Sequence, residues 1–371
     1  MVQFATILLS IILGISWMNH PVKTHTPSPQ KEIVDTTMVF KETGGRMDWC
    51  FKTNRIVMDM PAGKTTDIYS MDENGLDTIN LTREMIGQEL CGQKIEKYHQ
   101  KGHPVWHPDG TYIVFQVMNE HVSNPPKMTE YITFGGNYDL WIMKSDGSLK
   151  QKLTENPKGY GILHARFSKD GNKLMWGECF NSSSDSSIFG SWHIVVANLE
   201  YSENGEVKIK DSFKLQPGGE KFYETNEFSA DGKTIYFSSN IDSHKKSVNL
   251  YNWNTESKKL TKISEKPEVW EEMMLYSPTE KDTYAFISTR FFKWKPGMGY
   301  MTLRTELFLN KSGKVHRLTY NNAAEKKNKL SKLHYFIGDY CWGPDGKTLL
   351  VLYYGFQIGK FETKVVKIKL N

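Results

Sequence analysis

Residues 103–116 read HPVWHPDGTYIVFQ, and this stretch decides the fold because it recurs along the chain. Related blocks occupy residues 164–176 (HARFSKDGNKLMW), 225–237 (TNEFSADGKTIYF) and 339–352 (DYCWGPDGKTLLVL). Their turn glycines lie about 60 residues apart, with a double interval before the last block. A degenerate copy without the glycine fills that interval at residues 274–287 (MLYSPTEKDTYAFI). A repeat of this length predicts an array of similar supersecondary units.

Each block predicts a hairpin of two antiparallel strands. The Asp-Gly pair at its centre supplies a residue that tolerates a positive φ, which tight hairpin turns require. An apolar run follows the turn and an aromatic residue precedes it. We expect these aromatic side chains to pack inward; they are Trp106, Phe167, Phe228, Tyr276 and Trp342.

A second signature follows the hairpin in several repeats and predicts a second hairpin. It begins with an acidic or amide residue before an apolar strand, as in DLWIM from Asp139, NLYNW from Asn249 and ELFLN from Glu306. A polar turn and a Leu-Thr pair then complete the unit. These pairs are Leu153-Thr154, Leu260-Thr261 and Leu318-Thr319.

Six units of four strands each indicate an all-β fold, a six-bladed β-propeller. The last unit supplies only three strands, so we expect residues 32–40 (EIVDTTMVF) to close it as an N-terminal strand that leaves no open edge. Residues 83–101, between the first two blades, are predicted to be helical. A single propeller domain therefore spans residues 32–371. Its predicted blades are residues 46–82, 103–154, 160–215, 221–264, 269–319 and 335–371.

The composition excludes several classes of protein. With 39% hydrophobic and 24% charged residues, the chain is expected to be packed and globular. The net charge of +5 is spread along the sequence, so no nucleic-acid partner is expected. No nucleophile elbow, P-loop or dinucleotide fingerprint occurs. The four cysteines either pair or, as we expect, remain isolated buried thiols; they are Cys50, Cys91, Cys179 and Cys341.

An apolar run occupies residues 4–17 (FATILLSIILGISW) and is followed by a Pro-rich stretch. The run is shorter than the ~20 residues that span a bilayer comfortably. We interpret residues 1–20 as a signal peptide or N-terminal anchor and residues 21–31 as a flexible leader. The predicted location is periplasmic or secreted. In the alternative, residues 4–17 stay uncleaved and anchor the chain to a membrane. This segment is then the chain's only contact with a membrane.

The two hairpin signatures over residues 32–371 resemble those of the TolB-like six-bladed β-propeller family, with its WD-like β-propeller repeats. The resemblance implies the propeller fold. Relatives of this architecture include periplasmic partner-binding proteins, peptidase propeller domains and some polysaccharide lyases, so the fold does not decide the activity.

Candidate chemistry lies at the start of each inner strand, where the propeller channel should open. Equivalent positions, seven residues before the turn glycines, hold His103, His164, Thr225 and Asp339. Two imidazoles and a carboxylate suit one divalent metal ion, or acid and base roles. The alternative is that each histidine is a hydrogen-bonded structural residue. His107 occupies a variable turn position, and we interpret it as a surface turn residue.

A loop on the same predicted face reads RFFKWKPGMGY over residues 290–300. Aromatic side chains stack on sugar rings or peptides, and cations pair with carboxylates. In the alternative, the aromatic residues only cap the gap between blades. The candidate ligand-binding residues are Arg290, Phe292, Trp294, Lys295 and Tyr300.

We favour a non-catalytic propeller that binds an envelope protein or an acidic glycan on its loop face. The alternative is a metal-assisted carbohydrate-active enzyme, because oligogalacturonate lyases are similar in carrying histidines at strand starts around the axis. In that case His103, His164 and Asp339 would hold the metal, and Arg290 or a nearby lysine would be the base or charge clamp. The fifth blade lacks the further His and Gln that this resemblance implies. A structural component of an envelope assembly is the third hypothesis.

Overall fold

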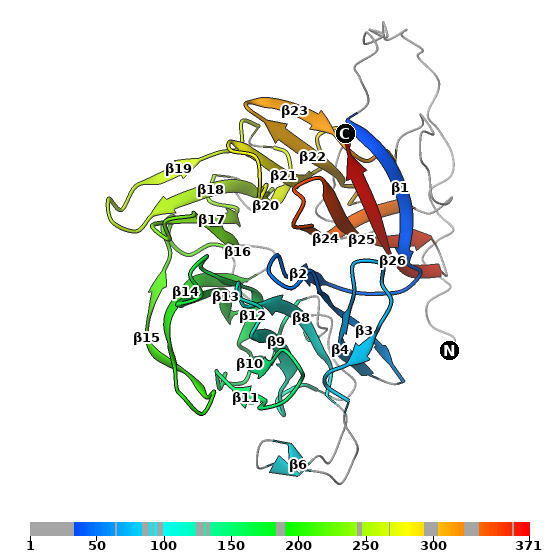
Figure 1. Ribbon diagram of the computed structural model, residues 1–371. Coiled ribbons are helices and arrows are strands. Elements are labelled where there is room, and N and C mark those ends of the chain that lie inside the picture. The colour runs from blue at the N-terminus through cyan, green and yellow to red at the C-terminus, as the bar shows by residue number, and fades with distance from the viewer. Residues whose placement is uncertain are drawn as a thin grey trace, which may run out of the picture. The chain divides into compact units, whose positions relative to one another are not determined.

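A computed structural model gives the structure of the protein (Figure 1). The chain divides after Glu32, and the predicted signal, anchor and leader segments lie outside the described residues. Among the described residues no helix is long and apolar enough to cross a membrane. The structure describes residues 33–63, 65–83, 89–90, 93–94, 99–123, 130, 134–182, 190–242, 247–266, 268–292, 303–322, 334–357 and 360–371.

Six antiparallel four-stranded sheets form a six-bladed propeller, which confirms the predicted fold class. From the inner strand outward, blades one to three are β2 (Met47–Trp49), β3 (Ile56–Ala62), β4 (Thr65–Met71) and β5 (Ile79–Asn80); β8 (Lys101–Trp106), β9 (Tyr112–Met118), β10 (Tyr138–Lys144) and β11 (Gln151–Lys152); β12 (Gly161–Phe167), β13 (Lys173–Asn181), β14 (Ser191–Tyr201) and β15 (Val207–Leu215). Blades four to six are β16 (Tyr223–Phe228), β17 (Thr234–Ser239), β18 (Asn249–Asn254) and β19 (Leu260–Lys262); β20 (Glu271–Tyr276), β21 (Thr283–Ser288), β22 (Glu306–Lys311) and β23 (Lys314–Arg317); β24 (His334–Trp342), β25 (Thr348–Gln357), β26 (Lys360–Leu370) and β1 (Val34–Lys41).

The hydrophobic core is divided into layers between neighbouring blades. In one layer, Trp106 and Phe115 of blade two pack with Val57 of blade one. In another, Trp342 of blade six packs with Leu309 of blade five. Because each blade buries both faces against its neighbours, its strands contain almost continuous runs of buried residues.

In blades two, three, four and six the first hairpin turns at the expected glycine. Gly110, Gly171, Gly232 and Gly346 all have positive φ, between 64° and 79°. In blade five, where the glycine is absent, Asp282 takes a positive φ of 52° one residue before β21. The degenerate repeat therefore keeps its hairpin by placing an aspartate in the left-handed region, which Asp tolerates better than most residues.

The second signature locks the outer hairpin by a pair of reciprocal bonds. In blade two the N–H of Leu140 donates to Thr154 Oγ1 at 2.9 Å, and the N–H of Leu153 donates to the Leu140 carbonyl. Blades one and five repeat the side-chain bond with Thr82 and Thr319. In blade four the N–H of Leu250 donates the equivalent bond to Ser264 Oγ. Ser264 lies three residues beyond the Leu-Thr pair quoted above, because residues 260–262 form β19 there.

The two ends of the described chain meet in blade six. β1 pairs with β26, so the N-terminal strand closes the last blade as predicted. The N–H of Asn371 also donates to the Ile33 carbonyl at 2.8 Å. In the same blade, Lys367 lies over the ring of Phe40 and also over that of Trp49 in blade one, 5.2 and 5.6 Å from the two centroids. Hydrogen bonds, apolar packing and a cation–π contact thus all act across the ring closure.

Two local predictions are wrong. Residues 83–101 were expected to be helical, but their described part contains the paired strands β6 (Glu89–Leu90) and β7 (Gln93–Lys94). His107 was expected at the surface, but it is buried. Its ring lies edge-on to Phe167 and Tyr201 of the next blade, and it fits there because that blade has no side chain at Gly171.

The cysteines Cys50, Cys179 and Cys341 are buried and free, and Cys91 lies outside the described residues.

Candidate functional site at the propeller axis

The inner strands are irregular where they pass the axis. A β-bulge interrupts the pairing of the inner strand in every blade from the second to the sixth. At three of these bulges a non-glycine residue has positive φ: 52° at His103, 51° at His164 and 55° at Met273. Such backbone conformations cost free energy and cluster at functional sites, and bulges re-aim side chains. The equivalent strain in three blades marks the axis as the candidate site.

Five side chains from different blades meet there, and we call them the axial ring: Arg46, His103, His164, Glu224 and Asp339. Arg46 Nη1 donates to His164 Nε2 and to Asp339 Oδ2, the latter at 3.3 Å. Glu224 Oε1 lies 3.0 Å from the same His164 nitrogen. Blade one therefore contacts blade three directly, past the intervening blade two, which is geometrically possible only at the axis. All five residues are buried.

His103 completes the ring without being hydrogen-bonded through its imidazole. Its ring lies 5.6 Å from that of His164, edge to face, and its backbone N–H donates to Asp59 Oδ2 at 2.9 Å. Neither ring nitrogen has a hydrogen-bond partner, and Arg46 Nε is also unpaired. A small cavity adjoins these atoms. It is lined by Arg46, Met47, His103, Pro104, Val105, His164, Arg166 and Asp339.

Burial dominates the protonation of the groups around the axis. It raises the pKa of Glu224 and of Asp59 to about 7, against the attraction of Arg46. It lowers the pKa of both His103 and His164, and the positive charges of Arg46 and Arg166 lower it further. The two imidazoles are thus held neutral, while the buried carboxyls retain protons more readily than they do in water.

Glu227, the first paired residue after the bulge of blade four, should give a measurable pH dependence of stability. Burial raises its pKa to about 7. Because the protonated form is favoured in the fold, its stabilisation is complete below about pH 4.5 and is lost as the pH rises through 7. We expect the difference in unfolding free energy between the wild type and Glu227→Gln to change by about 2 kcal/mol from pH 5 to pH 8.

Urea unfolding at the two pH values measures this difference. The comparison with the variant is needed because Asp59 and Glu224 shift stability in the same direction, whereas the two buried histidines shift it in the opposite direction. A difference that stays constant between pH 5 and pH 8 would show that Glu227 is ionised in the fold.

The three residues predicted to hold a metal line one cavity but do not converge on a common point. The guanidinium of Arg46 lies between His164 and Asp339 and contacts both. Among the described residues, no group of three or more His, Cys, Asp or Glu side chains is placed to hold a metal ion. The arrangement therefore does not fit a metal, and the metal assignment stays a prediction.

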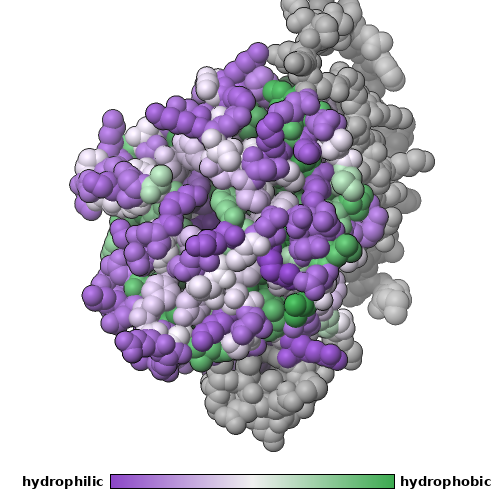
Figure 2. All heavy atoms as spheres, viewed as in Figure 1, coloured by the Kyte–Doolittle hydropathy of each residue, from purple (hydrophilic) through white to green (hydrophobic). Residues whose placement is uncertain are grey.

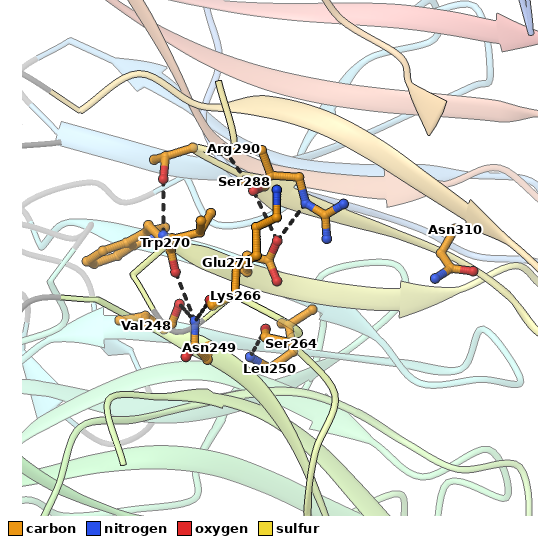
Figure 3. A network of polar contacts seen from close by, with 12 residues as sticks. Val248, Asn249, Leu250, Ser264, Lys266, Trp270, Glu271, Ser288, Arg290 and Asn310 are labelled. Carbon is orange, nitrogen blue, oxygen red and sulfur yellow. Dashed lines mark hydrogen bonds and ion pairs between the residues drawn. The ribbon is translucent and has the colours of Figure 1, made fainter. Parts of the chain in front are cut away.

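The predicted ligand-binding loop is described only in part. Arg290 Nε donates to Glu271 Oε1 at 2.8 Å (Figure 3), and the guanidinium also packs over Phe286. Ser288 Oγ donates to the same carboxylate, and Glu271 is almost fully buried. Arg290 is therefore engaged within blade five. Trp294, Lys295 and Tyr300 lie outside the described residues.

The neighbouring aromatic residues form a stack on blade five. Phe292 is half-buried and lies 5.8 Å from the guanidinium of Arg317. Arg317 also lies over Phe291 and Tyr320, at 4.9 and 4.5 Å. Phe291 is 62% exposed and presents an aromatic surface to solvent. Elsewhere the hydrophobic side chains visible in Figure 2 are scattered among hydrophilic ones, as far as the described residues show.

Arg46, Glu224 and Arg166 belong to the site although their positions were not singled out in the sequence. Arg46 precedes β2, in the blade whose first hairpin lacks the repeat signature. In blade four the axial residue is Glu224, whereas Thr225 hydrogen-bonds the His164 carbonyl and does not line the cavity. The signal for Glu224 in the sequence would have been its position directly before Thr225, which gives an acidic and a polar residue side by side ahead of the bulge.

Comparisons with known proteins support the fold. The sequence matches no protein-family model and no curated protein. The structure is similar to that of TolB from Acinetobacter baumannii, with a TM-score of 0.52, 14% identity, and coverage of 85% of this chain and 64% of that one. The putative TolB from Agrobacterium tumefaciens has a TM-score of 0.53 at 14% identity, with coverage of 85% of this chain and 91% of that one. An oligogalacturonate lyase in complex with manganese has a TM-score of only 0.46, at 11% identity over 90% of this chain and 89% of that one.

The chain therefore has a six-bladed β-propeller fold similar to that of the two TolB structures. At 14% identity the two TolB structures show a common fold and nothing more.

Proposed function

We propose that the chain is a non-catalytic TolB-like propeller, periplasmic or secreted, that binds a protein or an acidic glycan on its loop face. The loop face is the side that carries the blade-to-blade connections and the loops between second and third strands. The inner strands begin on this side, so the axial ring lies below it. The apolar run at residues 4–17 supports export.

The observation that carries the proposal is the strained, incompletely paired axial ring. Three inner strands hold a residue at positive φ beside the axis, and His103 has no partner for either ring nitrogen. Buried polar groups are normally hydrogen-bonded, so an orphaned imidazole beside a cavity supports a binding site. Binding is favoured over catalysis because Arg46, His164, Glu224 and Asp339 are already paired with one another.

A titration against matched ligands tests the proposal. Oligogalacturonate and an acidic peptide are compared by calorimetry with a neutral oligosaccharide and a basic peptide of equal length. We expect saturable binding of one acidic ligand, and much weaker binding by the His103→Ala/His164→Ala variant. If none of the acidic ligands binds better than its neutral or basic match, the proposal fails.

The metal-assisted lyase is the second candidate, because the rings of His103 and His164 and the carboxylate of Asp339 line one cavity. It requires a metal that displaces Arg46. Elemental analysis of the chain after incubation with manganese and zinc, followed by an ultraviolet assay for new double bonds in uronate polymers, separates the two candidates. A near-stoichiometric metal, absent from the double variant, together with unsaturated product would replace the binding proposal with the enzyme.

A further inference from the structure

The axial cavity is small enough to restrict what enters it. Its volume is about 10 Å³, which corresponds to one group the size of a water molecule. A sugar ring or an aromatic side chain is far larger. The cavity can therefore receive only the end of a ligand, such as an oxygen of a chain terminus or of a side chain.

The walls of the cavity offer hydrogen-bond donors that lack acceptors. His103 is 5% exposed, and neither of its ring nitrogens is bonded. A neutral imidazole carries one N–H, and Arg46 Nε, which is also unpaired, carries another. Arg166 stands on the wall with its Nε donating to the Asn226 carbonyl at 3.0 Å, which fixes the orientation of its guanidinium.

The charges of the lining residues favour an anion. Arg46 and Arg166 both border the cavity, and Asp339 is the one acidic residue among its lining residues. The carboxylate of Asp339 is 3.3 Å from Arg46, whereas Arg166 borders the cavity and its charge also acts on the nearby buried carboxyls of Asp48 and Glu224. Guanidinium groups bind carboxylates with two parallel N–H bonds, and such charge-assisted bonds are the strong ones.

We propose that the axial cavity admits one oxygen of a ligand carboxylate, and that this carboxylate is held by Arg166 and by the unpaired N–H groups of His103 and Arg46. This inference rests on the proposed function and narrows it, because the ligand must then present a free carboxylate that reaches the axis. Uronate groups and peptide carboxylates both satisfy this requirement. The cavity recognises the chemistry that they share.

Acetate is the probe, because it carries this group on a single methyl. Full-length protein is titrated with sodium acetate, with sodium chloride at equal ionic strength, and with acetamide, which has the same shape without the charge. We expect acetate to raise the melting temperature saturably while chloride and acetamide do not. Arg166→Gln should weaken acetate binding about tenfold or more, because it removes the charge-assisted pair.

Arg55→Gln is the matched control, since Arg55 pairs with the exposed Asp77 and does not line the cavity. It should bind acetate as the wild type does. If Arg166→Gln does not fold, His103→Leu serves instead, because it removes an unpaired donor without adding a charge. Equal effects of acetate and chloride, or equal acetate binding by wild type and Arg166→Gln, would overturn the inference.

The same variants separate this inference from the proposed function. If a glycan or peptide binds the wild type and Arg166→Gln equally well, the function stands and the carboxylate site does not. If acetate binds at the axis but none of the macromolecular ligands binds the protein, the carboxylate site stands and the proposed function fails.

Discussion

Replacing Arg46 with methionine should lower the free energy of unfolding by about 3–5 kcal/mol, which is the usual cost of removing one partner from a buried ion pair. Arg46 is buried and holds both Asp339 and His164, and it lies near Glu224. Without its guanidinium, the carboxylates of Asp339 and Glu224 are left in the interior without a compensating charge. Urea unfolding followed by tryptophan fluorescence measures the loss.

Two controls make this result specific. Arg55→Met removes a guanidinium from an exposed pair and should cost less than about 1 kcal/mol. Adding Glu224→Gln to Arg46→Met should restore part of the stability, because it removes one of the uncompensated carboxylates. If Arg46→Met costs no more than Arg55→Met, then Arg46 does not hold the ring together.

Gly135→Ala should destabilise the protein by about 2–4 kcal/mol, because it combines an unfavourable backbone conformation with a clash. Gly135 has a φ of +67°, and a Cβ atom there would lie 1.8 Å from the carbonyl oxygen of Ile162. That carbonyl belongs to the inner strand of blade three, whose Ile162 N–H donates to the Gly135 carbonyl at 2.9 Å. The backbone has no room to move without breaking this contact between blades two and three.

Gly232→Ala isolates the conformational part of the effect. Its φ of +68° is nearly the same, but nothing lies within 4 Å of the position of its Cβ. It should therefore cost only about 1–2 kcal/mol. Equal losses for the two variants would show that the loop of Gly135 adjusts freely, and that the contact with Ile162 does not hold the blades together.

The fold was predictable because its determinants are local and repeated. Each hairpin turn, each aromatic residue before it and each apolar strand lies within about a dozen residues. The closing strand β1 followed from a count of strands, since the last repeat supplied three where four were needed. The burial of His107 was not predictable in this way, because it depends on the absence of a side chain at Gly171 in the next blade.

The site was predictable only in part, because the bulges break the repeat at the axis. His103, His164 and Asp339 were found by their spacing, and they do line one cavity. In blade four the bulge follows Thr225, and the carboxylate of the preceding residue, Glu224, meets the ring. A shift of one residue along a strand exchanges the side chains on its two faces, and spacing alone does not reveal it. Arg46 was missed because its blade retains no first-hairpin signature.

The pairing of β1 with β26 also fixes the order of events during synthesis. The first strand to leave the ribosome has its partner among the last residues of the chain, more than 300 positions later. Blade six cannot form until β26 has been synthesised, and until then both β1 and blade five lack a neighbour. Contacts of such long sequence separation slow folding. The ring therefore closes late, after all six blades have been synthesised, and a variant that lacks residues 360–371 leaves β1 without a partner as well as shortening blade six.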